Sequence, residues 1–221
     1  KMLASSRSVG KKVTLKGKEY TVEELTHDSF KGVDIALFSA GGARSKEFAP
    51  SAVKAGAVVV DNSSFFRMDP EVPLVVPEIN PEDIRKHKGI IANPNCTTII
   101  GIVPVWPLHK ANPVKRMVVS SYQAASGAGQ SAMLELIQQA REVLDGKPVT
   151  ISALKYQLAF NVYCHDSKIG PNGYNEEEMK LVKETRKIFH CPDIVITGTC
   201  VRVPVLRAHS ESINLEFTDP I

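Results

Sequence analysis

The sequence has no long hydrophobic run and no block of like charge. Its longest apolar runs, residues 55–60 and 98–106, fall short of the ~18 residues that a membrane-spanning helix needs, and Pro104 interrupts the second. The 27 basic and 24 acidic residues are interspersed along the chain. We therefore expect no membrane partner and no nucleic-acid partner.

Cysteine is also scarce. The four cysteines, Cys96, Cys164, Cys191 and Cys200, are too few and too irregularly spaced for the disulfide framework of a secreted protein. We therefore expect free thiols and a reducing compartment. No CxxC or HxxxH pair brings two metal ligands together, so we expect no metal site.

What is present is typical of a folded chain. With 43% hydrophobic and 23% charged residues, the 221 residues suffice for one large domain or two small ones. Short apolar segments alternate with helical ones up to residue 94, which predicts a parallel sheet covered on both faces. Strands are expected at residues 1–4, 33–38, 57–61, 74–76 and 90–92, helices at 46–55 and 81–87, and an exposed hairpin at 13–20.

The pattern changes after residue 94, and we place a domain boundary there. A helix is expected from Cys96, and residues 148–173 are irregular. The remaining expected elements are strands at 116–122, 194–199 and 212–217 and helices at 129–144 and 175–189. The sequence thus predicts an α/β unit followed by an α+β domain.

Cys96 lies in the segment NPNCTT at residues 93–98, directly after a strand and in the first turn of a helix. Unpaired backbone N–H groups and the positive end of the helix dipole favour a thiolate there. This predicts a nucleophile; the alternative is an inert side chain buried under the turn. Such a nucleophile works with an acid or base from elsewhere in the chain. His209 is the best candidate, although the pattern also fits a surface or core histidine.

Two strand-to-helix turns are rich in small residues, SAGG at 39–42 and YQAASGAG at 122–129. Such turns let the backbone approach a bound anion or ring closely. No complete GxGxxG is present, so the pattern alone does not establish nucleotide binding. Arg7, just past the first strand, either holds a 2′-phosphate or lies in a solvated loop. The charges at residues 176–180 most simply form pairs on a solvated helix surface.

Several segments, in order along the chain, resemble the aspartate-semialdehyde dehydrogenase family. The four that carry most of the resemblance are NPNCTT at 93–98, YQAASGAG at 122–129, GYNEEEMK at 173–180, and CVRVP at 200–204 with HSES at 209–212. Further agreement comes from ASSRSVGK at 4–11, FSAGG at 38–42 and DNSSFFRM at 61–68. The resemblance runs along nearly the whole chain.

The resemblance implies a partial Rossmann-like, NADP-binding domain at residues 1–94 and a catalytic and dimerisation domain at residues 95–221. It implies NADP-dependent reductive dephosphorylation of 4-phospho-L-aspartate to L-aspartate 4-semialdehyde through a cysteine thioester, with inorganic phosphate as the other product. This step serves lysine, threonine, methionine and isoleucine biosynthesis. A homodimer or homotetramer in the cytoplasm, or in the plastid stroma of a plant or alga, is expected.

By the same resemblance, Cys96 is the nucleophile and His209 the acid/base. Three further sets of residues match the family's binding sites. They are Gln123, Glu177 and Arg202 for the substrate, Arg67, Asn95 and Lys180 for phosphate, and Arg7, Ser8, Ser39, Ala40, Gly41, Ser126 and Gly127 for NADP.

Both ends depart from the family pattern. Family members begin with a strand and a Gly-rich turn that holds the pyrophosphate, and they continue past the strand near Phe217, so we expect an internal fragment. Three other functions stay open. They are a noncatalytic fragment, a related reductase such as N-acetyl-glutamyl-phosphate reductase or glyceraldehyde-phosphate dehydrogenase, and a cysteine hydrolase using Cys96 and His209.

Overall fold

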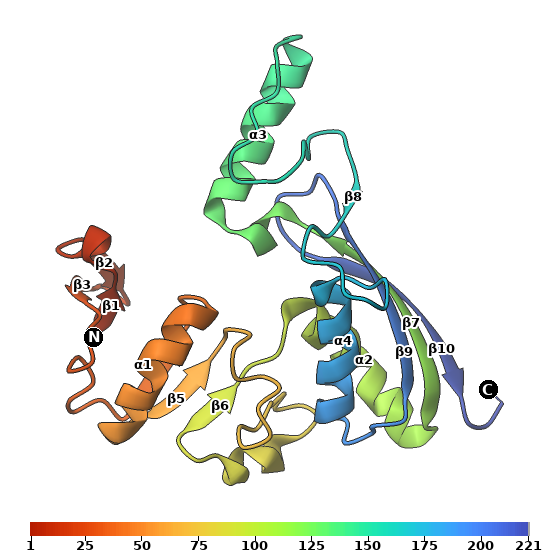
Figure 1. Cartoon of the computed structure of the whole chain (residues 1–221), viewed down its shortest axis with the longest axis horizontal. Coiled ribbons are helices and arrows are strands. Elements are labelled where there is room, and N and C mark those ends of the chain that lie inside the picture. The colour runs from red at the N-terminus through yellow and green to blue at the C-terminus, as the bar shows by residue number, and fades with distance from the viewer. Residues whose placement is uncertain (221) are drawn as a thin grey trace. The chain divides into compact units, whose positions relative to one another are not determined.

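The computed structural model describes residues 1–220. The chain divides into two compact units, Lys1–Pro94 and Asn95–Ile221, and this division falls where the sequence predicts a boundary. Each unit has its own sheets and helices (Figure 1). Within residues 1–220, no helix is long and apolar enough to cross a membrane.

The first unit opens with a small three-stranded sheet. β2 (Lys12–Leu15) and β3 (Lys18–Glu24) form the expected antiparallel hairpin, whose turn holds Lys16 and Gly17 at φ values of 49° and 76°. β1 (Met2–Ala4) pairs in parallel with the other side of β3. The strand order is therefore β1-β3-β2, which leaves β1 at an edge.

The same unit holds a second sheet of three parallel strands. In order across the sheet these are β4 (Ile35–Phe38), β5 (Val58–Asp61) and β6 (Ile90–Ala92). The helix α1 (Gly42–Lys54) connects β4 to β5, because parallel neighbours need a crossover connection. A 3₁₀ helix, η2 (Pro81–Lys86), precedes β6.

The strand expected at residues 74–76 is not formed. Leu74 makes only an isolated parallel bridge to Ala92, although residues 74–76 are all buried. Pro73 and Pro77 flank the segment, and proline cannot donate to a strand ladder. The segment therefore packs into the core without extending the sheet.

The expectation that β4 is covered on both faces is wrong for the described residues. Ile35 is 65% and Leu37 is 79% exposed, while the alternate residues Ala36 and Phe38 are buried. Within residues 1–220, β4 pairs only with β5. A pocket of about 530 Å³ is lined by residues of β1 and β4, including Leu3 and Leu37.

The second unit is built on one mixed sheet in the order β10-β7-β9-β8. Its strands are β7 (Val114–Gln123), β8 (Tyr163–Cys164), β9 (Val195–Arg202) and β10 (Ser210–Phe217). β7 and β9 are parallel, whereas β10 and β8 run antiparallel to their neighbours. Because β7 and β9 are parallel, their carboxyl ends lie at the same edge of the sheet.

Two helices, α2 (Cys96–Ala111) and α4 (Glu176–Ile188), pack together and cover one face of this sheet (Figure 1). The β7 residues Met117 and Val119, which face these helices, are at most 1% exposed. On α4 the buried residues Leu181 and Ile188 recur at helical spacing. This packing places the start of α2 beside α4.

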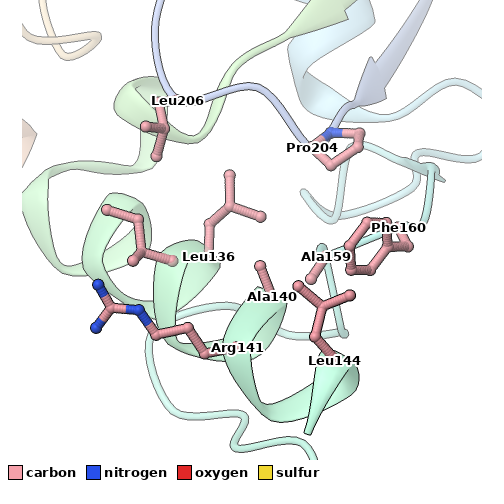
Figure 2. A pocket seen from close by; sticks show the side chains of 9 residues that line it. Leu136, Ala140, Arg141, Leu144, Ala159, Phe160, Pro204 and Leu206 are labelled. Carbon is pink, nitrogen blue, oxygen red and sulfur yellow. The ribbon is translucent and has the colours of Figure 1, made fainter.

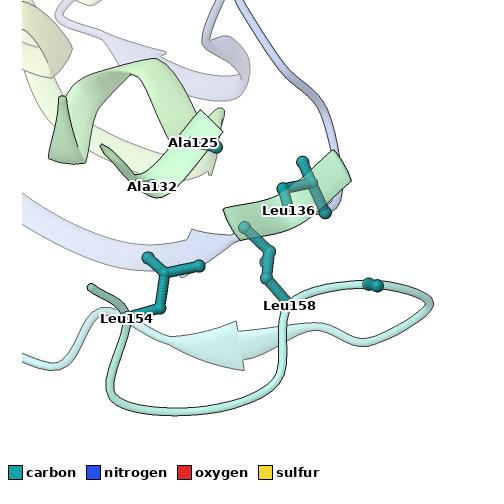
Figure 3. Close-up of a cluster of buried hydrophobic side chains, with 6 residues drawn as sticks. Ala125, Ala132, Leu136, Leu154 and Leu158 are labelled. Carbon is teal, nitrogen blue, oxygen red and sulfur yellow. The ribbon is translucent and has the colours of Figure 1, made fainter. Parts of the chain in front are cut away.

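A separate apolar core fixes α3 (Gln130–Leu144) against the irregular segment that follows it (Figure 3). The cluster includes Ala132 and Leu136 from α3 and Leu154 and Leu158 from the irregular segment. A short 3₁₀ turn, η3 (Ala125–Ala128), joins β7 to α3.

Candidate active site

Cys96 is the first residue of α2, and its side chain is exposed. The preceding residue, Asn95, caps the helix, because its Oδ1 accepts hydrogen bonds from the backbone N–H groups of Thr97 at 2.9 Å and Thr98 at 3.3 Å. The thiol therefore lies at the positive end of a long helix, where a thiolate is favoured. The alternative of a cysteine buried under the turn does not fit this exposure.

Two buried carboxylates of α4 hold the capping residue in place. Glu184 Oε2 accepts a hydrogen bond from the backbone N–H of Asn95 at 2.6 Å, and Glu177 Oε1 accepts one from its Nδ2 at 2.9 Å. Glu184 is 1% exposed and Glu177 is 5% exposed. α4 thus anchors the turn that carries the nucleophile candidate.

Glu177 is the centre of a polar cluster. Its Oε2 accepts a hydrogen bond from Lys180 Nζ at 2.9 Å, and its Oε1 also lies 3.4 Å from Gln123 Nε2. Burial alone would raise the pKa of Glu177, but Lys180, His165 and the hydrogen bond from Asn95 together lower it. The solvated-surface interpretation is therefore wrong for Glu177 and for Glu178, which is also buried.

Gln123 and Arg202 end β7 and β9 and lie opposite each other in the register. Both are buried. Gln123 Nε2 donates to Thr97 Oγ1 at 2.7 Å, which ties the end of β7 to the residue after Cys96. Arg202 Nη1 donates to the backbone carbonyl of Ala124 at 3.0 Å.

His209 is half-buried just before β10, and its Nδ1 accepts a hydrogen bond from the backbone N–H of Ala124 at 3.0 Å. A Cβ added at Gly127 would lie 2.9 Å from both His209 Cε1 and Nε2, and 3.2 Å from Arg202 Nη1. A side chain at position 127 would therefore have to displace one or both of these side chains. Burial, together with the charge of Arg202, lowers the pKa of His209.

Comparison with known proteins identifies the family. Residues 105–221 match the model of the semialdehyde dehydrogenase dimerisation domain, and residues 1–87 match its NAD binding domain. The aspartate-semialdehyde dehydrogenase of Synechocystis is 58% identical over the whole chain. The chain belongs to the aspartate-semialdehyde dehydrogenase family. The family and the fold class that the sequence predicts are thereby confirmed.

Two further relatives support the same family assignment. The aspartate-semialdehyde dehydrogenase of Bacillus subtilis is 50% identical over 98% of the chain. The crystal structure of aspartate semialdehyde dehydrogenase II from Vibrio cholerae, complexed with ASA, superposes with a TM-score of 0.97 at 45% identity, covering 99% of this chain and 66% of that one. The chain spans 65% of the Synechocystis relative and 64% of the Bacillus relative, just under two thirds of their length.

In this family member, the expected site residues fall in both units. The second unit brings together most of those expected to bind substrate or to react. They are Asn95, Cys96, Gln123, Gly127, Glu177, Lys180, Arg202 and His209, with Ser126 in the same turn as Gly127.

The first unit holds the other expected residues. Arg7 and Ser8 lie in a 3₁₀ turn, η1 (Ser6–Ser8), directly after β1, and Arg7 is exposed. Ser39, Ala40 and Gly41 form the exposed turn between β4 and α1.

Arg67 is buried in the first unit and donates to the backbone carbonyls of Asn93 at 2.9 Å and Asn62 at 3.1 Å. The expected phosphate site joins Arg67 to Asn95 and Lys180 of the second unit, and that grouping stays a prediction.

Sequence reasoning missed two residues of this family member's site. Glu184 follows Glu177 by seven residues, so the helical period alone could have placed both carboxylates on one face of α4. His165 is half-buried, its Nδ1 lies 3.1 Å from Ser167 Oγ, and its ring is close enough to Glu177 and Arg202 for their charges to affect its pKa. Burial lowers that pKa most strongly. No pattern in the sequence singles out His165.

Proposed function

We propose that the protein containing this chain interconverts 4-phospho-L-aspartate and L-aspartate 4-semialdehyde with NADP as the cofactor. The observation that carries the proposal is the exposed Cys96 at the start of α2, next to a buried polar cluster with Lys180 and Arg202 as its cations. The identity to enzymes named for this semialdehyde supports the choice of substrate.

Cys96 forms a covalent intermediate in this scheme. In the biosynthetic direction, its thiolate attacks the acyl carbon of the acyl phosphate, the S–C bond forms, and phosphate leaves with the electron pair of the C–O bond. The resulting thioester splits one difficult step into two easier ones. A bound nicotinamide would supply the hydride to the thioester carbon. Cleavage of the S–C bond would then release the aldehyde and return the Cys96 thiolate. The carboxylate and the phosphate of the substrate need cationic partners, and Arg202 and Lys180 are the cations of the candidate site.

Arg202 is the residue we assign to the substrate carboxylate. Its Nη1 is engaged with the carbonyl of Ala124, which fixes the guanidinium while leaving further N–H groups for a ligand. Glu177 is assigned to the amino group, and Gln123 orients the acyl group beside Thr97. Lys180 and Asn95, with Arg67, are assigned to phosphate.

The first unit fits a dinucleotide. Gly41 has a φ of 89° and precedes α1, and no side chain caps the first N–H groups of that helix. Free amides at a helix start, at the carboxyl edge of a parallel sheet, suit a phosphate. Arg7 and Ser8 are assigned to the 2′-phosphate that distinguishes NADP from NAD. A Candida albicans relative, 25% identical with a TM-score of 0.70, was solved with NADP.

We also propose that the protein is a homodimer. An open groove of about 520 Å³ is lined by apolar residues of α3 and by Phe160, Pro204 and Leu206, with Leu144 at 77% exposure (Figure 2). The groove belongs to the segment that matches a dimerisation-domain model, and a second copy of the chain is the occupant we assign to it. Leu144→Glu should shift the protein toward monomer in sedimentation velocity; an unchanged distribution would place the interface elsewhere.

The function is tested with the complete protein. L-Aspartate 4-semialdehyde should reduce NADP only when phosphate is present, and N-acetyl-glutamate semialdehyde should not replace it. Cys96→Ala should abolish turnover, whereas Cys164→Ala, which removes another exposed thiol, should not. Intact-mass spectrometry should show an aspartyl adduct that depends on Cys96. Turnover without phosphate, or an adduct on another residue, would reject the proposal.

A further inference from the structure

His165 lies between the end of β9 and the start of α4, the two elements that carry Arg202 and Glu177. Its backbone N–H donates to the carbonyl of Cys200 at 2.8 Å, and its own carbonyl accepts a hydrogen bond from Asn175 Nδ2 at 3.3 Å. Cys200 comes two residues before Arg202 on β9, and Asn175 caps α4 two residues before Glu177. The backbone of His165 is therefore fixed next to both of the elements that supply proposed substrate-binding residues.

The ring of His165 is held through Nδ1. This nitrogen accepts a hydrogen bond from the backbone N–H of Ser167 at 3.2 Å, and Ser167 Oγ lies 3.1 Å from it. Ser167 Oγ itself accepts the N–H of Glu177 at 3.2 Å, which leaves its hydroxyl proton to donate to Nδ1. Because a peptide N–H can only donate, Nδ1 presents a lone pair, and the proton of the neutral ring lies on Nε2.

The surroundings of the ring keep it neutral. Burial lowers the pKa of His165 most strongly, and the neighbouring carboxylates offset this only in part. Asp166 Oδ1 lies 3.9 Å from Nδ1, which is too far for a hydrogen bond. At neutral pH the ring is therefore a hydrogen-bond donor that carries no charge. The charged and titratable side chains around it are Glu177 and Lys180 on α4, Arg202 on β9, Asp166 in its own loop and His209 before β10.

The Nε2–H group of His165 has no hydrogen-bond partner among residues 1–220, although the side chain is mostly buried, at 16% exposure. A buried donor without a partner is unfavourable unless a ligand supplies the acceptor. Arg202 is the residue assigned to the substrate carboxylate. A carboxylate has about four acceptor positions, and a bidentate guanidinium fills two of them. The others need further donors, and His165 is a neutral donor within range of the charge of Arg202.

We propose that His165 is a further substrate-binding residue, whose Nε2–H donates a hydrogen bond to the carboxylate that Arg202 holds. This inference rests on the proposed function. The carboxylate takes no part in the bond changes at the acyl carbon, so its hydrogen bond is equally strong before and during the reaction. His165 therefore tightens substrate binding and does not accelerate the chemical step.

Two variants separate this donor from a structural role. The side-chain oxygen of asparagine can accept the N–H of the residue two positions later, so His165→Asn keeps the contact to Ser167 and loses Nε2–H. The amide nitrogen of glutamine can occupy the place of Nε2, so His165→Gln keeps a donor there. A hydrogen bond to a charged group corresponds to about 10- to 100-fold in a binding constant.

The kinetics of the complete protein give the result. We expect His165→Asn to raise the KM for L-aspartate 4-semialdehyde by about 10- to 100-fold, with kcat changed by less than about threefold. His165→Gln should keep both values within about threefold of the unchanged protein. A structural role predicts the reverse order, because only asparagine keeps the contact to Ser167. That reverse order, equal KM values in the two variants, or a loss confined to kcat would reject the proposal.

His87 provides a matched control. Its Nδ1 accepts the backbone N–H of Gly89 at 3.0 Å, which is the same contact two residues along the chain. His87 belongs to the first unit and to none of the expected sites. His87→Asn should therefore leave KM and kcat unchanged.

The donor is measured directly by NMR of the complete protein labelled with ¹⁵N-histidine. Cys96→Ala is used, because this variant can bind the semialdehyde without reacting with it. We expect His165 to carry its proton on Nε2, with Nδ1 unprotonated, and the Nε2–H signal to move downfield when L-aspartate 4-semialdehyde is added. The signals are assigned by their loss in His165→Asn. A proton on Nδ1, or an Nε2–H signal that the substrate leaves unchanged, would overturn the inference.

The two proposals can fail independently. Normal turnover together with an unchanged Nε2–H signal would leave the proposed function intact and reject the role of His165. Absence of any turnover in the unchanged complete protein would reject the proposed function, whereas the signals recorded without substrate would still decide whether His165 offers a donor.

Discussion

In the first unit, β4 leaves Ile35 and Leu37 exposed and pairs on one side only within the described residues, whereas the sheet of the second unit has its central strands paired on both sides. The residues expected to react or to bind substrate in the second unit are also more buried than the expected cofactor residues of the first unit. Buried carboxylates of α4 bind the turn of Cys96 through direct hydrogen bonds of 2.6 and 2.9 Å. The expected cofactor residues of the first unit, such as Arg7 and Ser39, are exposed. The turn that carries Cys96 is thus held in place by hydrogen bonds within the second unit itself.

The largest expected effect on stability comes from a matched pair of leucines. Leu181 on α4 is 0% exposed, and Leu37 on β4 is 79% exposed. In the chain of residues 1–221, Leu181→Ala should lower the free energy of unfolding by about 2–5 kcal/mol and Leu37→Ala by less than about 0.5 kcal/mol. Urea unfolding of both variants measures this. A large cost for Leu37→Ala that appears only in the complete protein would show that another segment covers β4.

Gly127→Ala should damage the site more than the fold. The added Cβ would force apart His209 and Arg202, which it would meet at 2.9 and 3.2 Å. A displacement of about 1 Å at a reacting group can cost about 10²-fold in rate. We expect a loss of that order in kcat/KM of the complete protein, with a much smaller change in Tm. Gly146 lies in the turn after α3 and has a φ of 65°, which disfavours any residue with a Cβ. Gly146→Ala should therefore lower Tm without this kinetic loss.

Glu184→Ala should loosen the turn that carries Cys96. It leaves the buried N–H of Asn95 without its carboxylate acceptor, which costs about 1–3 kcal/mol of stability. Glu184→Ala should also lower the activity of the complete protein. Glu184→Gln should restore that activity, because its amide keeps an acceptor oxygen for the N–H of Asn95. The rate of iodoacetamide alkylation of Cys96 as a function of pH reports the thiol pKa. If the alanine variant leaves both stability and that pH profile unchanged, the anchoring role fails.

A pH-dependent effect on stability is expected at Glu211 on β10. Both its carboxylate oxygens are buried without a hydrogen-bond partner in the described residues, and burial raises the pKa of Glu211 from 4.5 to about 7. The folded state therefore holds a proton that the unfolded state releases between these pH values. The contribution of Glu211 to the free energy of unfolding is fully present below about pH 4.5 and is lost as the pH rises toward 7. Glu211→Gln should flatten this part of the Tm profile; a slope equal to that of the unchanged chain would contradict it.

Much of the fold follows from pattern. The hairpin, the helix starting at Cys96 and the long helix ending at Leu144 were all predictable from periodicity and turn residues. The position of Cys96 was predictable as well, because a helix start after a strand is visible locally. The exposure of Leu37 was not, because an apolar run does not reveal how many neighbours its strand has.

The charged helix α4 shows where local reasoning stops. Glu177 and Glu184 look like solvated charges, yet they are buried because their partners are an amide and a backbone N–H from a turn some 80 residues away in the sequence. His209 Nδ1 likewise accepts a hydrogen bond from the backbone of Ala124, 85 positions earlier in the sequence. Such long-range pairings become visible only when the sheet is assembled.

The unpaired edges of β1 and β4 within residues 1–220 have a practical consequence. An unpaired strand edge flanked by apolar side chains is a template for strand addition between molecules. Residues 1–221 produced alone should therefore aggregate or exchange strands through this edge, and a lysine in place of Leu37 should act as a gatekeeper that improves solubility.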